Sequence, residues 1–273
     1  MAHCVVPEAE AILDKEFPVL DKGFVRLVDY LGSDSRIVQA ARVSYGEGSK
    51  SFRQDKGLIS YLMRNEHTSP FEQVNFTFHI KMPIFVARQW IRHRTARVNE
   101  ISGRYSVMAN EAYIPDMEHI NFQSDDNKQG RSDEPVDQKT REQVASILKA
   151  DQERAFAAYH EMLDLGIARE LARIDLPLSL YTQWYWQMDL HNLFHFLKLR
   201  LDNHAQYEIR VYAEAILEII RTVCPMACEA FEQLILHAER FSSREIEAIK
   251  TMIQGNECPL SGRERQLFDA KFQ

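Results

Sequence analysis

The segment 71–83 constrains the fold most, because its hydrophobic pattern predicts a strand that runs directly into a helix. Apolar residues alternate with polar residues or histidine from Val74 to Ile80 (VNFTFHI), which predicts a half-buried strand that ends at Pro83. Proline suits the first turn of a helix, so the following sequence, PIFVARQWIRHR (83–94), is predicted to be helical. This order favours a fold in which a helix packs on a strand.

The remaining patterns predict one domain of the α+β class. Strands are predicted over 23–32 and in the aromatic-rich segment 176–186. Helices are predicted over 34–46, 53–66, 139–166, 189–199, 204–222 and 225–240. The polar segment 116–138 is expected to be an insertion loop, because the patterns on both sides look incomplete alone, and 1–22 is an N-terminal extension. We therefore expect a single domain over 1–273, helix-rich, with an antiparallel or mixed sheet.

Composition and cysteine content indicate the cellular compartment in which the protein is expected. The 273 residues include 40 acids and 33 bases, for a net charge of −7. The four cysteines, Cys4, Cys224, Cys228 and Cys258, are too few and too scattered for a disulfide framework, which agrees with a reducing compartment. The sequence shows neither a long apolar run nor the basic and apolar pattern of a secretory signal at its start. We expect a cytoplasmic protein that is not a membrane protein.

An arginine-rich stretch, RQWIRHRTARVNEISGRYS (88–106), is unusual in an acidic chain, since it contains a single acid. In the predicted helix, Gln89, Arg92 and His93 share one face. The opposite face, predicted to be buried, comprises Ile84, Ala87 and Ile91. Guanidinium groups bind phosphate and carboxylate through paired hydrogen bonds, so the stretch is a candidate anion site. The alternative interpretation is a solvated charged surface.

The same stretch resembles the signature of the flavin-dependent thymidylate synthases, R-H-R-x-x-S-x-N-E-x-S-x-R-Y. This chain has RHRTARVNEISGRY and departs from the signature once, with Arg97 in place of the serine. The matching positions are Arg92, His93, Arg94, Asn99, Glu100, Ser102, Arg104 and Tyr105. Further segments are similar to blocks of that family: ARVSYG, HTSPFEQVNFTFHIKMPIFVARQW, ARIDLPLSLYTQWYW and LRLDNHAQYEIR. The resemblance therefore covers most of residues 23–228.

The resemblance implies an enzyme that methylates dUMP reductively to dTMP. Methylenetetrahydrofolate would supply the carbon, and FAD reduced by NADPH would supply the hydride. An arginine can make the uracil C5 nucleophilic by stabilising negative charge across N3 and its neighbouring carbonyl, so no cysteine nucleophile is required. The resemblance also implies a homotetramer with active sites between subunits and each FAD held by several chains.

The resemblance assigns site residues position by position. The dUMP contacts fall on Gln89, Arg92, Glu100, Ser102, Gly103, Arg104, Arg173 and Arg200. The FAD contacts fall on Ser44, His67, Ser69, Arg92, His93, Arg94, Glu100, Asp189, His191, His195 and His204. Arg200 is marked as the catalytic residue that activates the pyrimidine. Without the resemblance, it could be interpreted as a helix C-terminal arginine that complements the helix dipole.

Two other functions fit parts of the sequence. A nucleic-acid-binding module also clusters arginines, but it needs a basic face along its length, which an acidic chain does not favour. A metal-dependent hydrolase would be built on His93, His191, His195 and His204. His191 and His195 lie at i, i+4 on a predicted helix, yet a pair without a third ligand is more often a packed pair. We expect small-molecule substrates, no bound metal and no nucleic acid.

Overall fold

The structure, a computed structural model, describes residues 4–43, 52–125, 130–132 and 134–272. By its internal contacts the chain divides into two compact units, Met1–Ala230 and Phe231–Gln273. The sequence predicts one domain, whereas these contacts separate the C-terminal helices from the rest. The sheet and every described site residue lie in the first unit.

Five strands form one sheet in the order β1-β2-β3-β5-β4, and each neighbouring pair is antiparallel. The strands are β1 (Glu16–Val19), β2 (Gly23–Leu31), β3 (Asn75–Pro83), β4 (Arg97–Glu100) and β5 (Tyr181–Asp189). The predicted α+β class is confirmed, and the sheet is antiparallel rather than mixed. The sequence pattern predicts the three inner strands, whereas the short edge strands β1 and β4 show no clear alternation.

The central pair, β3 and β5, buries one face. Phe78 lies opposite Trp186 and Ile80 lies opposite Trp184, and all four side chains are at most 2% exposed. Side chains alternate between the faces of a strand, so this register places the large aromatic residues of both strands on the same side of the sheet. That side therefore forms the core on which helices pack.

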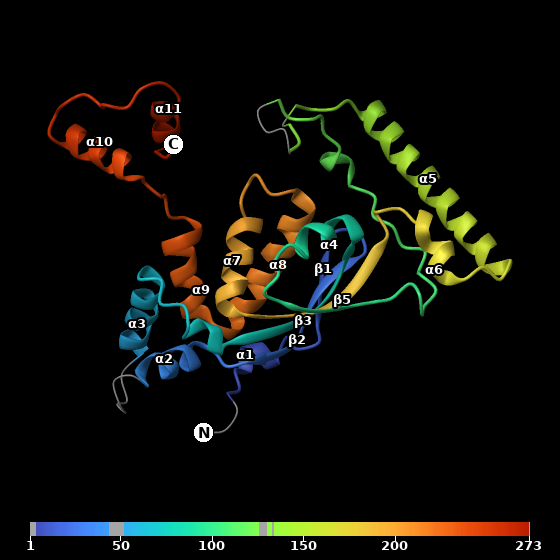
Figure 1. Cartoon of the computed structure of the whole chain (residues 1–273), viewed down its shortest axis with the longest axis horizontal. Coiled ribbons are helices and arrows are strands. Elements are labelled where there is room, and N and C mark those ends of the chain that lie inside the picture. The colour runs from blue at the N-terminus through green and yellow to red at the C-terminus, as the bar shows by residue number, and fades with distance from the viewer. Residues whose placement is uncertain (1–3, 44–51, 126–129, 133, 273) are drawn as a thin grey trace. The chain divides into compact units, whose positions relative to one another are not determined.

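Among the described residues, nine α-helices begin in the first unit, and the last of them ends at the first residue of the second unit. They are α1 (Pro7–Glu10), α2 (Asp34–Arg42), α3 (Phe52–Arg64), α4 (Ile84–Trp90), α5 (Gln138–Asp164), α6 (Arg169–Ala172), α7 (Leu190–Arg200), α8 (Tyr207–Val223) and α9 (Pro225–Phe231). Short 3-10 turns occur at Phe71–Gln73, Met117–His119 and Arg173–Asp175. Helices α7 and α8 lie side by side over the sheet, with α8 against β1 and β2 and α4 against β3 (Figure 1).

Trp90 joins α4 to this core. Its ring stacks on Phe196 of α7 (centroids 4.8 Å apart, interplanar angle 22°) and meets Trp184 and Trp186 edge-on at 5.8 and 5.4 Å. Trp90 is fully buried. Aromatic clusters of this kind bury a large apolar area and restrict ring orientation. The end of α4 is therefore held at one place between the sheet and α7.

The helix predicted over 83–94 is too long. It ends at Trp90, and Ile91, predicted to be buried, is 45% exposed. The backbone N–H of His93 bonds to the Trp90 carbonyl (3.0 Å), which closes a tight turn. The chain must leave the helix there because it returns to the sheet as β4, which pairs with β5. The prediction for 225–240 is likewise too long, since α9 ends at Phe231 and a π-helical turn, Glu232–Leu236, follows.

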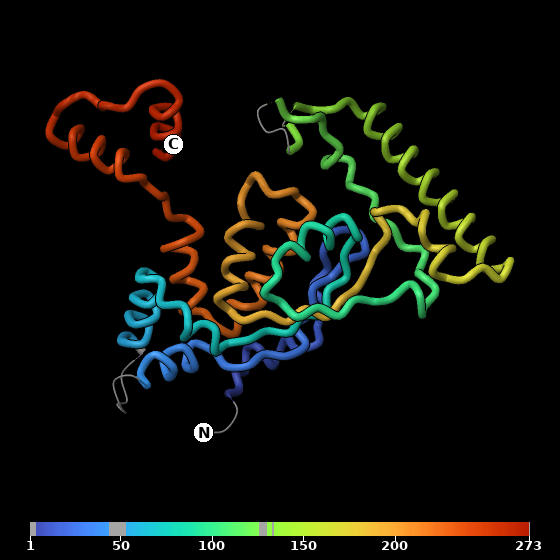
Figure 2. The backbone as a smooth tube through the Cα atoms, viewed as in Figure 1, coloured from blue at the N-terminus to red at the C-terminus, as the bar shows by residue number. Residues whose placement is uncertain are grey.

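The two predicted peripheral segments have different structures. The extension 1–22 contains α1, which contacts α8, and β1, which adds an edge strand to the sheet. The described residues of the insertion 116–138 include a 3-10 turn and an isolated bridge between Gln123 and Arg131. Figure 2 shows the described residues of this segment, in green, ahead of α5. The Asp137 side chain caps α5 by accepting a hydrogen bond from the Thr140 backbone N–H (3.0 Å).

The second unit contains α10 (Ser243–Ile253) and α11 (Gly262–Ala270), which the sequence patterns do not predict. Its small core consists of Ala248, Leu260 and Phe268. A reciprocal capping box between Ser242 and Glu245 starts α10. Across the described parts of both units, no helix combines the length and apolar character needed to cross a membrane.

Asp34 links α2 to α9. Its carboxylate accepts hydrogen bonds from the backbone N–H groups of Met226 (2.8 Å) and Ala227 (3.0 Å). Burial raises the pKa of this carboxyl from 3.8 to about 6, against the opposite effect of the two hydrogen bonds. Desolvation of the charged form therefore outweighs its hydrogen bonding.

The raised pKa of Asp34 predicts how stability depends on pH. Because the folded chain holds this proton more tightly than the unfolded chain, the resulting stabilisation is present below pH 4 and is lost as pH rises through about 6. Between pH 4 and 7, the unfolding free energy of the parent relative to Asp34→Asn should fall by on the order of 1–3 kcal/mol. Urea unfolding across this range measures the difference, and a difference that is independent of pH contradicts the prediction.

Candidate active site

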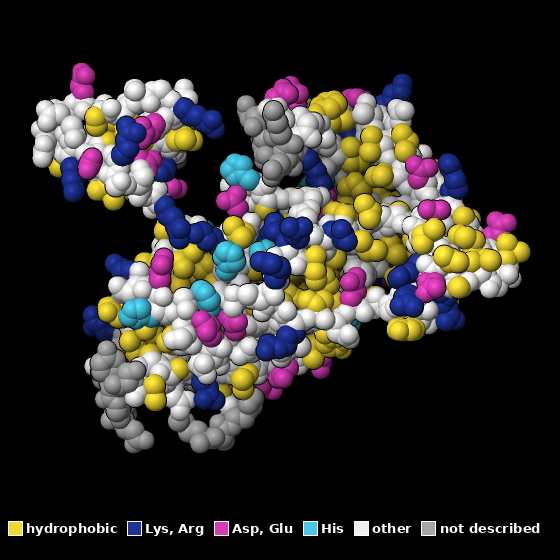
Figure 3. All heavy atoms as spheres, in the orientation of Figure 1, with side chains coloured by type: hydrophobic (Ala, Val, Ile, Leu, Met, Phe, Trp, Pro, Cys, Tyr) yellow, Lys and Arg dark blue, Asp and Glu magenta, His cyan; other side chains and the backbone are white. Residues whose placement is uncertain are grey.

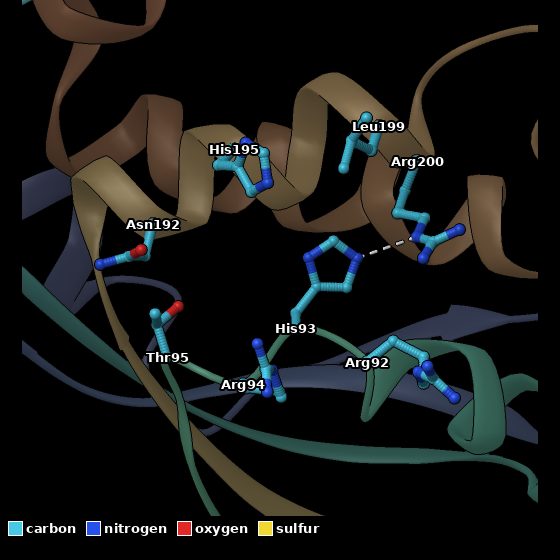
Figure 4. A pocket seen from close by; sticks show the side chains of 8 residues that line it. All are labelled: Arg92, His93, Arg94, Thr95, Asn192, His195, Leu199 and Arg200. Carbon is cyan, nitrogen blue, oxygen red and sulfur yellow. Dashed lines mark hydrogen bonds between the residues drawn. The ribbon is translucent and has the colours of Figure 1, made fainter.

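A cavity of about 570 Å³ opens between the turn after α4 and one face of α7 (Figure 4). It is lined by Arg92, His93, Arg94, Thr95, Asn192, His195, Leu199 and Arg200. None of these eight residues, all in the part of the chain that the structure describes, is acidic. Figure 3 shows Lys or Arg side chains (dark blue) beside His side chains (cyan) in this region of the first unit. The cavity is therefore cationic and suits an anionic ligand.

Helix spacing sets the α7 side of the cavity. The Asp189 carboxylate caps α7, accepting hydrogen bonds from the backbone N–H (2.9 Å) and the side-chain Nδ2 (2.7 Å) of Asn192. This cap fixes where the helix begins and hence which residues face the cavity. Asn192, His195 and Leu199 follow at spacings of three and four, which places them on one helix face.

His93 and Arg200 form the central polar contact of the cavity. The Arg200 Nε–H donates a hydrogen bond to His93 Nε2 (3.0 Å). Burial, followed by the nearby charges of Arg200 and His195, lowers the pKa of His93 to about 4. The ring is therefore neutral at physiological pH. Because Nε2 accepts, the ring proton lies on Nδ1.

This contact orients the Arg200 guanidinium. Burial lowers the pKa of Arg200 from its ordinary value, but a guanidinium still carries its charge at neutral pH. Its Nε–H is engaged by His93, and the two terminal nitrogens extend beyond that contact in Figure 4. A half-buried guanidinium fixed in this way offers two parallel donors to a ligand.

A second cavity, of about 390 Å³, contains other predicted dUMP residues. Glu100, Gly103 and Arg173 contribute to its lining. The Glu100 carboxylate accepts a hydrogen bond from Thr182 Oγ1 (2.6 Å). A Cβ at Gly103 would lie 3.0 Å from Met108 Sδ and 3.1 Å from Arg173 Cδ, so a side chain there would crowd the arginine. Glycine keeps this wall of the cavity open.

The other predicted residues lie outside these two linings. Gln89 donates a hydrogen bond to Gln206, and Arg104 pairs with Glu170 at 3.2 Å. His204 is exposed and contacts Asp202 (Nδ1 to Oδ1, 2.9 Å). His67 is exposed with its ring against Tyr61. Ser69, Ser102, Asp189 and His191 likewise line neither cavity, and Ser44 is outside the described residues. The single chain therefore brings Arg92, His93, Arg94, His195 and Arg200 together in the first cavity. It brings Glu100, Gly103 and Arg173 together in the second cavity and leaves the other predicted residues dispersed.

Sequence reasoning did not assign several residues that line the two cavities, among them Thr95, Asn192, Leu199 and Thr182. The sequence could have indicated two of them, because Asn192 and Leu199 are spaced from His195 as residues on one helix face are. Thr95 and Thr182 carried no such signal. The hydrogen bond from Thr182 to Glu100 depends on the pairing of β4 with β5, which no local pattern predicts.

Comparison with known proteins identifies the family. The family model described as thymidylate synthase complementing protein matches residues 26–226, and the model described as thymidylate synthase ThyX C-terminal domain matches residues 239–273. The flavin-dependent thymidylate synthase of Treponema denticola is 60% identical over 96% of this chain and 98% of its own length. The chain belongs to the flavin-dependent thymidylate synthase family. The resemblance drawn from the arginine-rich signature is thus confirmed, and the chain is an enzyme of the thymidylate synthase class.

Two further relatives extend the family comparison. The flavin-dependent thymidylate synthase of Treponema pallidum is 55% identical over 100% of this chain and 90% of its own length. Among solved structures, the UMP/dUMP methylase PolB of Streptomyces cacaoi bound with 5-Br UMP has a TM-score of 0.73 and 34% identity, covering 80% of this chain and 97% of PolB. A protein that is similar to this chain in structure has therefore been solved with a pyrimidine nucleotide. Within the described residues, no group of three or more His, Cys, Asp or Glu side chains could hold a metal ion.

Proposed function

We propose that this chain catalyses the reductive methylation of dUMP to dTMP, with methylenetetrahydrofolate as carbon donor and NADPH as reductant of bound FAD. The observation that carries the proposal is Arg200, whose guanidinium is half-buried in a cationic cavity and held by the neutral ring of His93. A fixed cation beside a pyrimidine stabilises negative charge that develops on N3 and its neighbouring carbonyl. The C5 carbon then becomes nucleophilic without attack by an enzyme thiol.

The residues of the first cavity fit a flavin dinucleotide. A pyrophosphate is an anion that guanidinium groups bind through paired hydrogen bonds, and Arg92 and Arg94 line the cavity together with His93 and His195. When bound, FAD supplies the redox chemistry of the reaction. We assign its remaining contacts to Ser44, His67, Ser69, Glu100, Asp189, His191 and His204. Neutral His93 can pack against a ligand ring without adding charge to the site.

The residues of the second cavity fit the phosphate end of dUMP. Arg173 supplies a guanidinium, and Gly103 keeps the adjacent wall open. We assign the phosphate contacts to Ser102, Gly103, Arg104 and Arg173. Gln89, Arg92, Glu100 and Arg200 are assigned to the rest of the nucleotide. Arg104 must exchange Glu170 for the phosphate, and the pair is more than half exposed, so its loss costs little.

We propose a homotetramer with active sites between subunits. Three apolar side chains close to Arg173 in the sequence are exposed: Leu171 (57% exposed), Ile174 (70%) and Leu178 (66%). Large apolar residues gathered at a surface favour association with another protein surface. Contacts from a second subunit would also complete the dispersed residue set. The cytoplasmic location and the absence of nucleic-acid partners remain predictions.

One experiment tests the proposed reaction. The purified protein is expected to be yellow, to carry non-covalent FAD and to form dTMP from dUMP, methylenetetrahydrofolate and NADPH under low oxygen. Nucleotide analysis measures the product, and light scattering measures the mass of the assembly. A colourless monomer that FAD does not reconstitute contradicts the proposal.

Removal of the four cysteines tests the absence of a thiol nucleophile. Cys224 and Cys228 are buried, and burial raises the pKa of Cys224 well above its ordinary value, so its thiol is a poor nucleophile. A variant with alanine at both buried positions and serine at Cys4 and Cys258 should still form dTMP when FAD-loaded. The assay is the same nucleotide analysis. Complete loss of product in a folded, flavin-bound variant would show that a cysteine takes part in the chemistry.

A further inference from the structure

A series of hydrogen bonds leads from a buried carboxylate to Gln89. Glu208 lies in the first turn of α8, and its side chain is 1% exposed. Its carboxylate accepts hydrogen bonds from the Tyr113 hydroxyl (3.2 Å) and from Gln206 Nε2 (2.8 Å), and forms an ion pair with Arg131. Gln206 Oε1 in turn accepts a hydrogen bond from Gln89 Nε2. The insertion, the start of α8 and the end of α4 are thus connected through the Glu208 carboxylate.

The carboxylate determines the direction of each hydrogen bond in this series. A carboxylate that is paired with a guanidinium accepts hydrogen bonds and does not donate them, so Gln206 must turn its NH2 group toward Glu208. The oxygen of the Gln206 amide then faces Gln89, which must donate from its own NH2 group. The oxygen and nitrogen of an amide lie on opposite sides of its carbon. The Gln89 oxygen is therefore turned away from Gln206.

The position of Gln89 makes this orientation relevant to the ligand. Gln89 lines neither cavity of the single chain, but it lies in the last turn of α4, three residues before Arg92, which lines the first cavity with Arg200. A freely rotating glutamine amide can pair with either uracil or cytosine, since it can present its oxygen or its nitrogen to the N3 edge. Uracil carries an N–H at N3, whereas cytosine carries a lone pair there. A fixed amide oxygen directed at N3 accepts a hydrogen bond from the N–H of uracil and faces the lone pair of cytosine, so it favours uracil.

We propose that Glu208 is a positioning residue that fixes the Gln89 amide as a hydrogen-bond acceptor, so that the site selects uracil over cytosine nucleotides. The inference rests on the proposed function, because it takes Gln89 to contact the pyrimidine of dUMP. Glu208 acts through Gln206 and does not touch the nucleotide. The buried Glu208 of α8 thereby contributes to the selectivity for the base, in addition to the residues that line the cavity.

Equilibrium binding of dUMP and of dCMP to the FAD-loaded protein, measured by calorimetry, tests the proposal. The parent should prefer dUMP. Glu208→Gln replaces an obligate acceptor by an amide that can also donate, so Gln206 and Gln89 can flip. The ratio of dUMP to dCMP affinity should fall about tenfold or more, since each misdirected buried hydrogen bond weakens binding by about that factor.

Two further variants separate positioning from folding. Tyr113→Phe removes another hydrogen bond to the same carboxylate but leaves Gln206 and Gln89 untouched, so it should lower the melting temperature and keep the affinity ratio. Gln206→Leu breaks the series at a residue whose side chain does not cap the helix, and it decides the question if Glu208→Gln does not fold. Its affinity ratio should fall as in Glu208→Gln.

The outcomes distinguish this inference from the proposed function. If the parent binds dUMP and dCMP equally, or if Glu208→Gln and Gln206→Leu keep the parent ratio, the positioning role is wrong while dUMP methylation stands. An equal loss of selectivity in Tyr113→Phe would also overturn it, because stability alone would then explain the effect. A parent that binds FAD but not dUMP would overturn both.

Discussion

Arg200→Ala should lower dUMP methylation by on the order of a hundredfold or more, while the fold, FAD binding and flavin reduction by NADPH persist. The guanidinium is held by His93 in a cavity without described acidic residues, so it is a preorganised donor that alanine cannot replace. Single-turnover methylation that starts from reduced flavin, with saturating dUMP and folate, isolates this step. Methylation at the parent rate in this assay would reduce Arg200 to a helix-end charge and require another residue to activate the pyrimidine.

Two variants control the Arg200 experiment. Arg200→Lys should recover little activity, because one ammonium cannot reproduce both the Nε contact with His93 and the paired terminal donors. Arg97→Ser restores the residue of the family signature and should change turnover only slightly, because Arg97 is exposed on the edge strand β4. A large effect of Arg97→Ser would show that this surface position takes part in the site.

Gly23→Ala should lower the free energy of unfolding by about 2–4 kcal/mol. A Cβ at Gly23 would lie 2.0 Å from the Tyr212 hydroxyl oxygen, 2.7 Å from the Val19 carbonyl oxygen and 2.8 Å from the Lys81 carbonyl oxygen. Two of these neighbours are backbone atoms, so relief requires displacement of strands. The Tyr212 hydroxyl also donates a hydrogen bond to the Lys81 carbonyl (2.7 Å), which the methyl group would disrupt. Urea unfolding followed by circular dichroism measures the loss.

Gly57→Ala is the matched control. Gly57 is exposed in the middle of α3, and a Cβ there meets no atom within 4 Å. Alanine should therefore stabilise the protein by about 0.5–1 kcal/mol, because glycine is the poorer helix former. Adding Tyr212→Phe to Gly23→Ala should recover part of the loss, since it removes the nearest clashing atom. If Gly23→Ala is as stable as the parent, the strand β2 is not packed as closely as the structure shows.

Local sequence determined the inner strands, most helices and the family. Strand β3 carries its own alternation of buried aromatic residues and ends at Pro83, so its existence follows from residues that are neighbours in the chain. The signature at 92–105 is likewise continuous in sequence, and the family that it indicates is the family that the comparisons identify. Such features can be predicted without the tertiary structure, because the periodicity and spacing of neighbouring residues determine them.

Tertiary structure decided where the elements end and what they meet. The apolar spacing allows a helix to 94, but burial of Trp90 and the return of the chain to β5 end it earlier and expose Ile91. The edge strands β1 and β4 form because they pair with the neighbouring strands β2 and β5. The hydrogen bond from Arg200 to His93 joins residues more than a hundred positions apart, as does the one from Gln89 to Gln206. Such contacts form only when the sheet and its helices assemble, because the free energy that fixes them comes from packing distant segments and not from any local preference.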